Sequence, residues 1–213
     1  MTSTPALAGQ VAIVTGASRG LGRSIALALA AAGAAVAVAA RSKADLEETA
    51  GLVQHAGGRA LAIPTDVTSY TEVERLIDAT RSTFGRLDVL VNNSGIAKVQ
   101  PLVDWRPEDW RTVLDVNLIG VFNGCRAAGP HFIAQSAGKV IIDMCINNRH
   151  RIHKKAGNSE AVIKDRRSSG RFCAFLVIRP SAAMSSSRLS GRPLASVALK
   201  WVQTNSSGFR SGA

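Results

Sequence analysis

The sequence predicts an α/β fold with a doubly wound parallel sheet, incomplete or divergent at its C-terminal end, and three observations support this prediction. Segments of helical periodicity alternate with five short apolar runs, at residues 11–15, 36–40, 59–64, 87–91 and 138–142. A glycine-rich stretch joins the first run to the first helical segment. The composition changes abruptly after residue 148. A chain of 213 residues is long enough for one such domain with a substantial core.

The first strand, over residues 11–15, is short and apolar, as expected of a strand buried on both faces, and Gly16 ends it. The next helix ends at Gly33 and presents one apolar face, formed by Leu21, Ile25 and Leu29. The later elements are, in order, a strand over residues 36–40, a helix over 45–55, a strand over 59–64, a helix over 73–84, a strand over 87–91, a helix over 107–128 and a strand over 138–142.

The glycine-rich stretch reads Thr15-Gly16-Ala17-Ser18-Arg19-Gly20-Leu21-Gly22 and lies between a strand and a helix. In this context Gly16 permits a tight turn, Gly20 lets the backbone approach a phosphate, and Gly22 lets the helix pack on the strand. The free N–H groups and the positive end of the helix dipole then attract a pyrophosphate. An ordinary glycine turn is the alternative interpretation.

Two further motifs accompany this stretch. The sequence Asn92-Asn93-Ser94-Gly95 follows the apolar run at residues 87–91, and Asn117 lies within the helix predicted over residues 107–128. With these motifs, residues 6–142 resemble the classical short-chain dehydrogenase/reductase family. The resemblance implies a Rossmann-like NADP-binding domain over residues 1–146. It also implies an oxidoreductase that transfers a hydride between NADP(H) and an alcohol or ketone.

The resemblance further implies a cofactor site, formed by Gly16, Ser18, Arg19, Gly20, Leu21, Gly22, Arg41, Asp66, Val67, Asn93 and Gly95. We expect NADP(H) in preference to NAD(H), because Ala40 occupies the family's acidic position and Arg41 and Arg19 can contact a 2′-phosphate. Three simpler interpretations remain. Arg41 could be a solvated strand-end residue, Asp66 could close a turn or cap a helix, and the asparagine pair could form a plain turn.

The residues that perform the family's chemistry are not found at the expected places. The family has a catalytic Ser after the fifth strand, a position that falls near Cys145, and then a Tyr-x-x-x-Lys pair, which this sequence lacks. Tyr70 lies far upstream of this position. Residues 160–164 have the four-residue spacing of a Tyr-x-x-x-Lys pair, but Glu160 stands in place of Tyr. Asn117 remains as the catalytic residue, which family members use to hold a water in a proton relay. The alternative is an Asn satisfied by its own helical turn.

The last third of the chain has a different composition. Residues 149–213 contain 13 basic and 2 acidic residues, which accounts for the whole net charge of +11. A segment rich in Ser, Arg and Gly buries little apolar area, so residues 147–213 are predicted to form a divergent, poorly packed basic tail. Its apolar stretch at residues 172–178 is the part expected to be ordered. A frame change in the coding sequence and a genuine divergent segment both remain open.

Composition also bears on other classes of function. Three cysteines without metal-ligand spacing predict no metal site and fit reduced thiols. We expect no signal peptide and no membrane span, because Gly33 splits the uncharged stretch over residues 24–40, and we predict a cytoplasmic location. The tail has few aromatic residues for stacking, so no specific nucleic-acid recognition is expected.

Two functions from different classes follow from these observations. The first is an active oxidoreductase whose partner is a small-molecule alcohol or ketone. The second is a non-catalytic dinucleotide-binding protein, or a defective family member, that lacks the Ser and the Tyr-x-x-x-Lys pair. A homo-oligomer is an open alternative to a monomer in either case.

Overall fold

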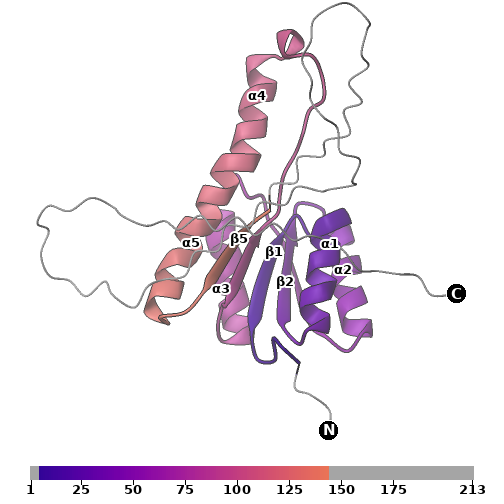
Figure 1. Ribbon diagram of the computed structural model, residues 1–213, viewed down its shortest axis with the longest axis vertical. Coiled ribbons are helices and arrows are strands. Elements are labelled where there is room, and N and C mark those ends of the chain that lie inside the picture. Colours follow the sequence, from indigo (N-terminus) through magenta and orange to yellow (C-terminus); the bar gives the residue numbers. More distant parts are fainter. Residues whose placement is uncertain (1–4, 144–213) are drawn as a thin grey trace, which may run out of the picture. The chain divides into compact units, whose positions relative to one another are not determined.

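The computed structural model describes residues 5–143, which form a five-stranded parallel sheet flanked by helices (Figure 1). The strands lie in the order β3-β2-β1-β4-β5. Their bounds are β1 (Val11–Thr15), β2 (Ala35–Ala40), β3 (Arg59–Pro64), β4 (Val89–Asn92) and β5 (Lys139–Ile142). The predicted doubly wound parallel sheet is confirmed.

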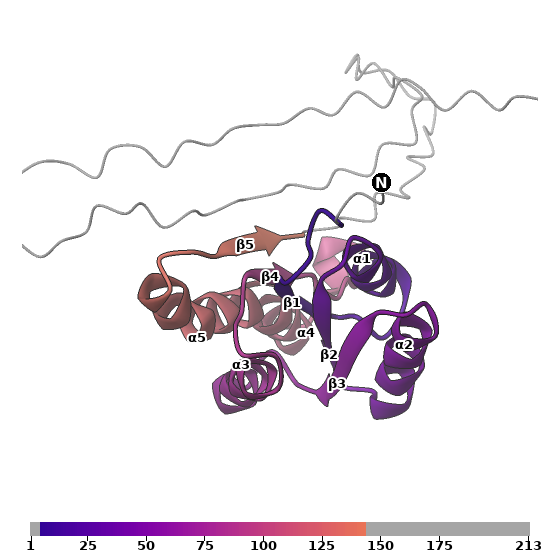
Figure 2. The same cartoon turned by 90° about the horizontal axis from the view of Figure 1, so that it is seen from below.

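Helices cover both faces of this sheet, with α1 and α2 on one face and α3 and α5 on the other (Figure 2). The helices are α1 (Gly20–Ala31), α2 (Lys43–His55), α3 (Tyr70–Phe84), α4 (Pro107–Leu114) and α5 (Gly120–Ala134). A short 3₁₀ turn, η1 (Leu102–Asp104), precedes α4, and a π-helical segment, η2 (Asp115–Ile119), joins α4 to α5.

β1 lies at the centre of the sheet. Ile13 pairs with Ala37 of β2 on one side and with Leu90 of β4 on the other, and all three strands run in the same direction. The chain therefore winds outward from β1 through β2 and β3, and then returns to place β4 on the opposite side of β1. A crevice forms at the carboxyl ends of the strands where the order reverses in this way, and ligands of open α/β sheets bind there.

Each face of the sheet has its own apolar core. On the α1–α2 face the core residues include Val14, Val36, Val38, Ala26 and Leu46. On the α3–α5 face they include Ile13, Leu76, Ile77, Leu90 and Phe132. Because both faces of β1 are buried, its sequence is apolar throughout rather than alternating.

The helix predicted over residues 107–128 differs from the structure in two respects. It is interrupted by η2, and it continues to Ala134. Pro130 lies inside α5, although a proline removes one N–H donor and ordinarily ends a helix. Ala127 and Phe132 are buried on either side of Pro130, and this packing against the sheet stabilises the last turn. In Figure 1, α4 extends beyond the carboxyl edge of the sheet.

Several predictions concern parts of the chain outside residues 5–143, and these stay predictions. They are the Ser position near Cys145, the spacing at residues 160–164, the apolar stretch at residues 172–178, and the domain boundary between residues 146 and 147. Among the helices that the structure does describe, none combines the length and the apolar character needed to cross a membrane.

Candidate functional site

A cleft of about 490 Å³ lies at the carboxyl edge of the sheet. Ten residues of the predicted cofactor site line it: Gly16, Ser18, Arg19, Leu21, Gly22, Arg41, Asp66, Val67, Asn93 and Gly95. They come from segments as far apart in sequence as the end of β1 and the loop after β4. Gly20 belongs to the same loop but is not among the lining residues.

A second cavity, of about 220 Å³, lies at the opposite edge of the sheet, near Gly9, Gly33 and Arg59. The amino ends of the strands and the C-terminal ends of α1 and α2 meet there, and helix C-termini repel anions. Ligands of open α/β sheets bind at the carboxyl edge instead. The larger cleft is therefore the candidate site.

Backbone conformation and close packing explain the glycines of the loop after β1. Gly16 and Gly20 have φ angles of 66° and 58°, a region in which residues with a side chain are strained. A Cβ atom on Gly22 would collide with the carbonyl oxygen of Gly16 and the side-chain amide of Asn93. A Cβ atom on Gly20 would meet nothing within 4 Å, so the backbone at Gly20 is open to close approach.

Thr15, the last residue of β1, fastens the glycine loop to the end of β4. Its hydroxyl donates to the carbonyl of Val91 (3.3 Å) and accepts from the backbone N–H groups of Asn93 and Ser94 (3.0 Å each). The side-chain amide of Asn93 donates in turn to the carbonyls of Thr15 (2.8 Å) and Gly16 (3.3 Å). Thr15 is the leading residue of the glycine motif, but no binding role for it is predicted from the sequence. The available signal is a single polar residue at the end of an apolar strand.

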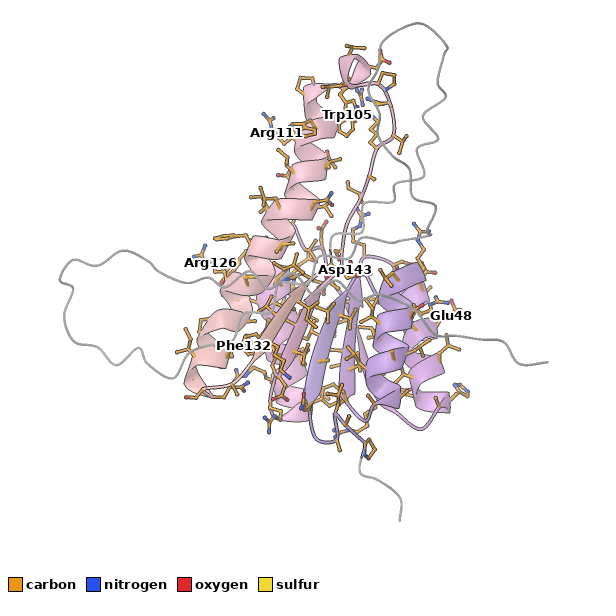
Figure 3. The ribbon with its side chains drawn as sticks, viewed as in Figure 1. Glu48, Trp105, Arg111, Arg126, Phe132 and Asp143 are labelled. Carbon is orange, nitrogen blue, oxygen red and sulfur yellow. The ribbon has the colours of Figure 1, made fainter. Side chains whose placement is uncertain are left out.

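The two asparagines after β4 do different things. Asn92 is buried, its carbonyl accepts from the N–H of Asp143, and its side-chain amide lies 3.8 Å from the sulfur of Cys125 on α5. Asn93 lines the cleft and binds the glycine loop. The plain turn considered as an alternative is therefore wrong for this pair. Asp143, at the carboxyl end of β5, is labelled in Figure 3 at this edge of the sheet.

Charged side chains of both signs line the cleft near the end of β2. Arg41 follows β2, Arg19 precedes α1, and both residues are exposed on the cleft wall. Asp45, in the first turn of α2, lines the same cleft. From the sequence alone, no carboxylate is expected at this strand end. Asp45 could not be recognised, because a position within a predicted helix does not show which wall of the cleft the side chain joins.

Asp66 lines the cleft and also closes a turn. Its Oδ1 accepts from the backbone N–H of Thr68 (2.9 Å) and from the Thr68 hydroxyl (2.8 Å). Its own N–H donates to the carboxylate of Glu72 (2.8 Å) in the first turn of α3. The turn interpretation of Asp66 is thus correct, and it is compatible with a position beside a ligand.

Asn117 lies in η2 and binds the loop after β4. Its Oδ1 accepts from the N–H of Ile96, and its Nδ2 donates to the carbonyl of Ile96, both at 2.9 Å. The alternative in which Asn117 is satisfied by its own helical turn is wrong. Ile96 and Val116 line the cleft, so Asn117 joins two of its walls.

Tyr70 lies away from the cleft. It begins α3, and the guanidinium of Arg126 on α5 lies 4.7 Å from the centre of its ring. Desolvation and the neighbouring Glu74 carboxylate raise the pKa of the Tyr70 phenol. A proton donor for a carbonyl substrate needs a pKa lowered toward neutrality. Tyr70 therefore has neither the position nor the acidity of such a donor.

An ionic cluster joins the loop after β4 to the start of α4. Arg106 donates two hydrogen bonds to the carboxylate of Asp109 (3.0 and 3.1 Å), and Lys98 forms an ion pair with the same group. These donors hold the pKa of Asp109 well below its usual range. The rings of Trp105 and Trp110 pack edge-to-face beside it, with centroids 5.4 Å apart. Figure 3 labels Trp105 at the outer end of α4.

Comparisons with known proteins agree with this geometry. The model of one protein family, described as short chain dehydrogenase, matches residues 10–149. A 3beta-hydroxysteroid dehydrogenase 1 from Eggerthella lenta is 40% identical over 139 residues, covering 65% of this chain and 53% of that protein. A 3-oxoacyl-[acyl-carrier-protein] reductase from Synechocystis sp. is 43% identical over 137 residues, covering 64% and 56%. The chain thus spans about half the length of these curated relatives.

A solved structure is similar over the same region. It is a metagenomic short-chain oxidoreductase in complex with NADP, with a TM-score of 0.61 and 36% sequence identity. The similarity covers 64% of this chain and 62% of that one.

Proposed function

The chain belongs to the short-chain dehydrogenase family, and from this premise we propose that it binds NADP(H) and transfers a hydride between this cofactor and an alcohol or ketone. The family consists of oxidoreductases that use NAD(H) or NADP(H) and act on small molecules. One observation carries the proposal. A single cleft contains both the glycine loop before α1 and the two cationic residues Arg19 and Arg41.

The residues of the cleft fit a dinucleotide. The pyrophosphate would lie against the glycine loop, where the N-terminus of α1 favours negative charge and the open space at Gly20 admits a close approach. We assign Asp66 and Val67 to the adenine end, and Asn93 and Gly95 to the nicotinamide end. This places the two ends of the cofactor at the carboxyl ends of β3 and β4.

The preference for NADP(H) over NAD(H) is assigned to Arg41 and Arg19. A guanidinium forms charge-assisted, bidentate bonds with phosphate oxygens, which a ribose hydroxyl cannot match. Asp45 acts in the opposite direction, because its carboxylate repels a 2′-phosphate and can accept from a 2′-hydroxyl. With two cations against one carboxylate at this wall, the balance favours the phosphate.

When bound, NADP(H) would supply or accept the hydride, and a protein group must correspondingly give or take the proton at the substrate oxygen. Asn117 is assigned to this end of the cleft as the relay residue, since it holds the Ile96 peptide beside Gly95. Tyr70 is not available as the acid, because it packs against Arg126. General acid–base catalysis typically contributes about 10²–10⁴-fold, so turnover should be slower than in family members with a tyrosine acid.

A second candidate function is dinucleotide binding without turnover. The specific observation that favours it is that the chain contains one tyrosine, Tyr70, and the structure places it outside the cleft. The two candidates share every residue assigned to cofactor binding. They differ only in the presence of a proton donor.

Two measurements on the full chain test both candidates. Fluorescence titration with NADPH and NADH should give saturable binding, tighter for NADPH. Oxidation of NADPH is then followed with a panel of ketones. Turnover with at least one ketone supports the oxidoreductase, and binding without turnover across the panel supports the second candidate. Absence of binding to either cofactor would contradict both.

A further inference from the structure

The outer side of the glycine loop is held by side chains from α1 and α2. Thr49 of α2 is fully buried, and its hydroxyl lies 3.0 Å from the carbonyl oxygen of Ala17 and 3.4 Å from that of Ser18. Arg23 of α1 donates twice to the Ser18 carbonyl, from Nε (3.1 Å) and from Nη2 (2.6 Å). Two successive carbonyls of the loop therefore point toward α2.

This orientation fixes the N–H groups on the other side of the same peptides. In a trans peptide the C=O and N–H bonds point in opposite directions, and the described chain has no cis peptide. The carbonyls of Ala17 and Ser18 share their peptides with the N–H groups of Ser18 and Arg19, two residues that line the cleft. Within residues 5–143 neither N–H has a hydrogen-bond partner. Free N–H groups beside a helix N-terminus are the donors that bind phosphate.

Arg23 is not itself placed to bind an anion. Its Nη1 and Nη2 donate to the two carboxylate oxygens of Glu48 (2.8 and 2.9 Å), and its single Nε proton is shared between the Ser18 carbonyl and the Thr49 hydroxyl (2.9 Å). The carboxylate neutralises the charge, and neither Arg23 nor Thr49 lines the cleft. Figure 3 labels Glu48 beside α1 and α2. These side chains therefore act on the backbone of the loop.

Arg23 and Thr49 donate mainly to different carbonyls of the loop. The Thr49 hydroxyl has one proton and three carbonyl neighbours, because the Asp45 carbonyl lies 3.0 Å from it as well. Since Arg23 satisfies the Ser18 carbonyl, the hydroxyl is free to serve Ala17 or Asp45. Without Arg23, the Ser18 carbonyl keeps only the Thr49 hydroxyl at 3.4 Å, and without Thr49 the Ala17 carbonyl has no partner among residues 5–143. Either loss frees a peptide of the loop to rotate.

We propose that Thr49 and Arg23, the latter oriented by Glu48, are positioning residues that preset the Ser18 and Arg19 N–H groups for the pyrophosphate of the dinucleotide. The proposal rests on the proposed NADP(H) binding. It adds a second layer of residues, on α1 and α2, that determine affinity for one part of the cofactor without touching it.

The test compares two ligands on the full chain. NADPH contains the pyrophosphate, whereas adenosine 2′-phosphate contains the adenine, the ribose and the 2′-phosphate only. Thr49→Val removes the hydroxyl and keeps the shape. It should weaken NADPH binding about tenfold, the effect of losing one hydrogen bond to a charged group, and leave adenosine 2′-phosphate within about twofold of wild type. Thr49→Ser should restore NADPH affinity.

Matched variants separate positioning from stability. Thr80→Val removes the hydroxyl of another fully buried threonine, which bonds the carbonyl four residues earlier in α3 as Thr49 does in α2. It should leave both affinities unchanged. Arg23→Lys keeps the positive charge but removes the planar guanidinium that reaches several acceptors at once. It should also weaken NADPH binding and leave adenosine 2′-phosphate binding unchanged. Glu48→Gln should do so more mildly, whereas Glu47→Gln, on an equally exposed carboxylate paired with Lys43, should have no effect.

The outcomes are distinct. Wild-type affinity for NADPH in Thr49→Val and Arg23→Lys would overturn the positioning proposal and leave the cofactor proposal intact. Equal losses for both ligands would also overturn it, because they would indicate general damage to the fold. If the wild-type chain bound neither ligand, the cofactor proposal would fail and the positioning proposal with it.

Discussion

Asn117 and Ile96 are joined by a reciprocal pair of hydrogen bonds, each 2.9 Å long, between one side-chain amide and one backbone peptide group. Ile96 belongs to the loop after β4, and Asn117 belongs to the π-helical turn between α4 and α5. A side-chain amide that matches both groups of a peptide fixes the position and the orientation of that peptide. The wall of the cleft after Gly95 is set in this way.

Asn117→Ala should therefore destabilise the protein. Two hydrogen bonds of about 0.5–1.5 kcal/mol each predict a loss of about 1–3 kcal/mol in the free energy of unfolding, measured by urea denaturation. Thr112→Ala is the control, because this exposed threonine lies one turn earlier and bonds only the Glu108 carbonyl of its own helix. A midpoint for Asn117→Ala equal to that of the control would contradict the bracing role.

Arg41→Ala should weaken NADPH binding about tenfold and leave NADH binding unchanged. The exposed guanidinium forms a charge-assisted bond at the low end of the range for such bonds. Fluorescence titration measures both affinities, and Arg75→Ala, on an exposed arginine of α3, is the control. Equal losses for the two cofactors would mean that Arg41 does not recognise the 2′-phosphate.

Asp45→Asn should change the same preference in the opposite direction. Removing the carboxylate relieves repulsion of a 2′-phosphate and takes away an acceptor for a 2′-hydroxyl, so the NADPH-to-NADH affinity ratio should rise a few-fold. Salt screens charges near the surface, so the increase should shrink in titrations at high ionic strength. A ratio that falls would show that Asp45 supports the phosphate side.

Gly20→Ala should combine a stability loss with a loss of cofactor binding. Gly20 and Gly57 both have positive φ angles, 58° and 80°, and a Cβ on either would meet nothing within 4 Å. Both alanine variants should be destabilised by about 1–2 kcal/mol, the cost of a left-handed backbone with a side chain. NADPH affinity should fall for Gly20→Ala alone, because the methyl group fills the space open to a phosphate. Equal NADPH affinities in the two variants would remove Gly20 from the cofactor site.

Ionised Asp109 should make the stability of the protein depend on pH in acid. Arg106 and Lys98 hold the pKa of folded Asp109 below its unfolded value, so the folded protein binds fewer protons in acid than the unfolded chain does. The stability that Asp109 provides is complete above the unfolded pKa of about 3.9 and is lost as the pH falls toward the folded pKa. The difference in Tm between wild type and Asp109→Asn should be constant from about pH 5 to 8 and shrink below about pH 4. Asp104→Asn, on an exposed carboxylate of η1, should show no such difference.

Much of the fold could be predicted from local pattern. The strands around Ile13, Ala37 and Leu90 are short and apolar because both faces of a parallel sheet are covered, and glycines mark their ends. The continuation of α5 through Pro130 could not be predicted, because local propensity argues for a stop. Packing of Phe132 on the sheet outweighs that propensity, and packing is not visible in a local window.

The site divides in a similar way. The glycine loop, Arg41 and Asn93 could be identified because each lies within two residues of the end of a predicted strand. Asp45 and Thr49 could not, because they lie within a helix whose rotation against the loop is set by the tertiary structure. Chain order alone predicts that Tyr70 lies away from the position of the family's catalytic tyrosine. The contact of Tyr70 with Arg126 could not be predicted, since α3 and α5 meet only in the folded protein.

The bonds between Thr15 and Asn93 join residues 78 positions apart, and this separation affects when the cleft can form. During synthesis the glycine loop leaves the ribosome long before β4 has been made. Closing so long a segment costs conformational entropy, so such distant contacts form late in folding. A nascent chain that ends before Asn93 would carry the complete glycine motif yet lack a finished cleft. We therefore expect the cleft, and with it the proposed cofactor binding, to form late in folding.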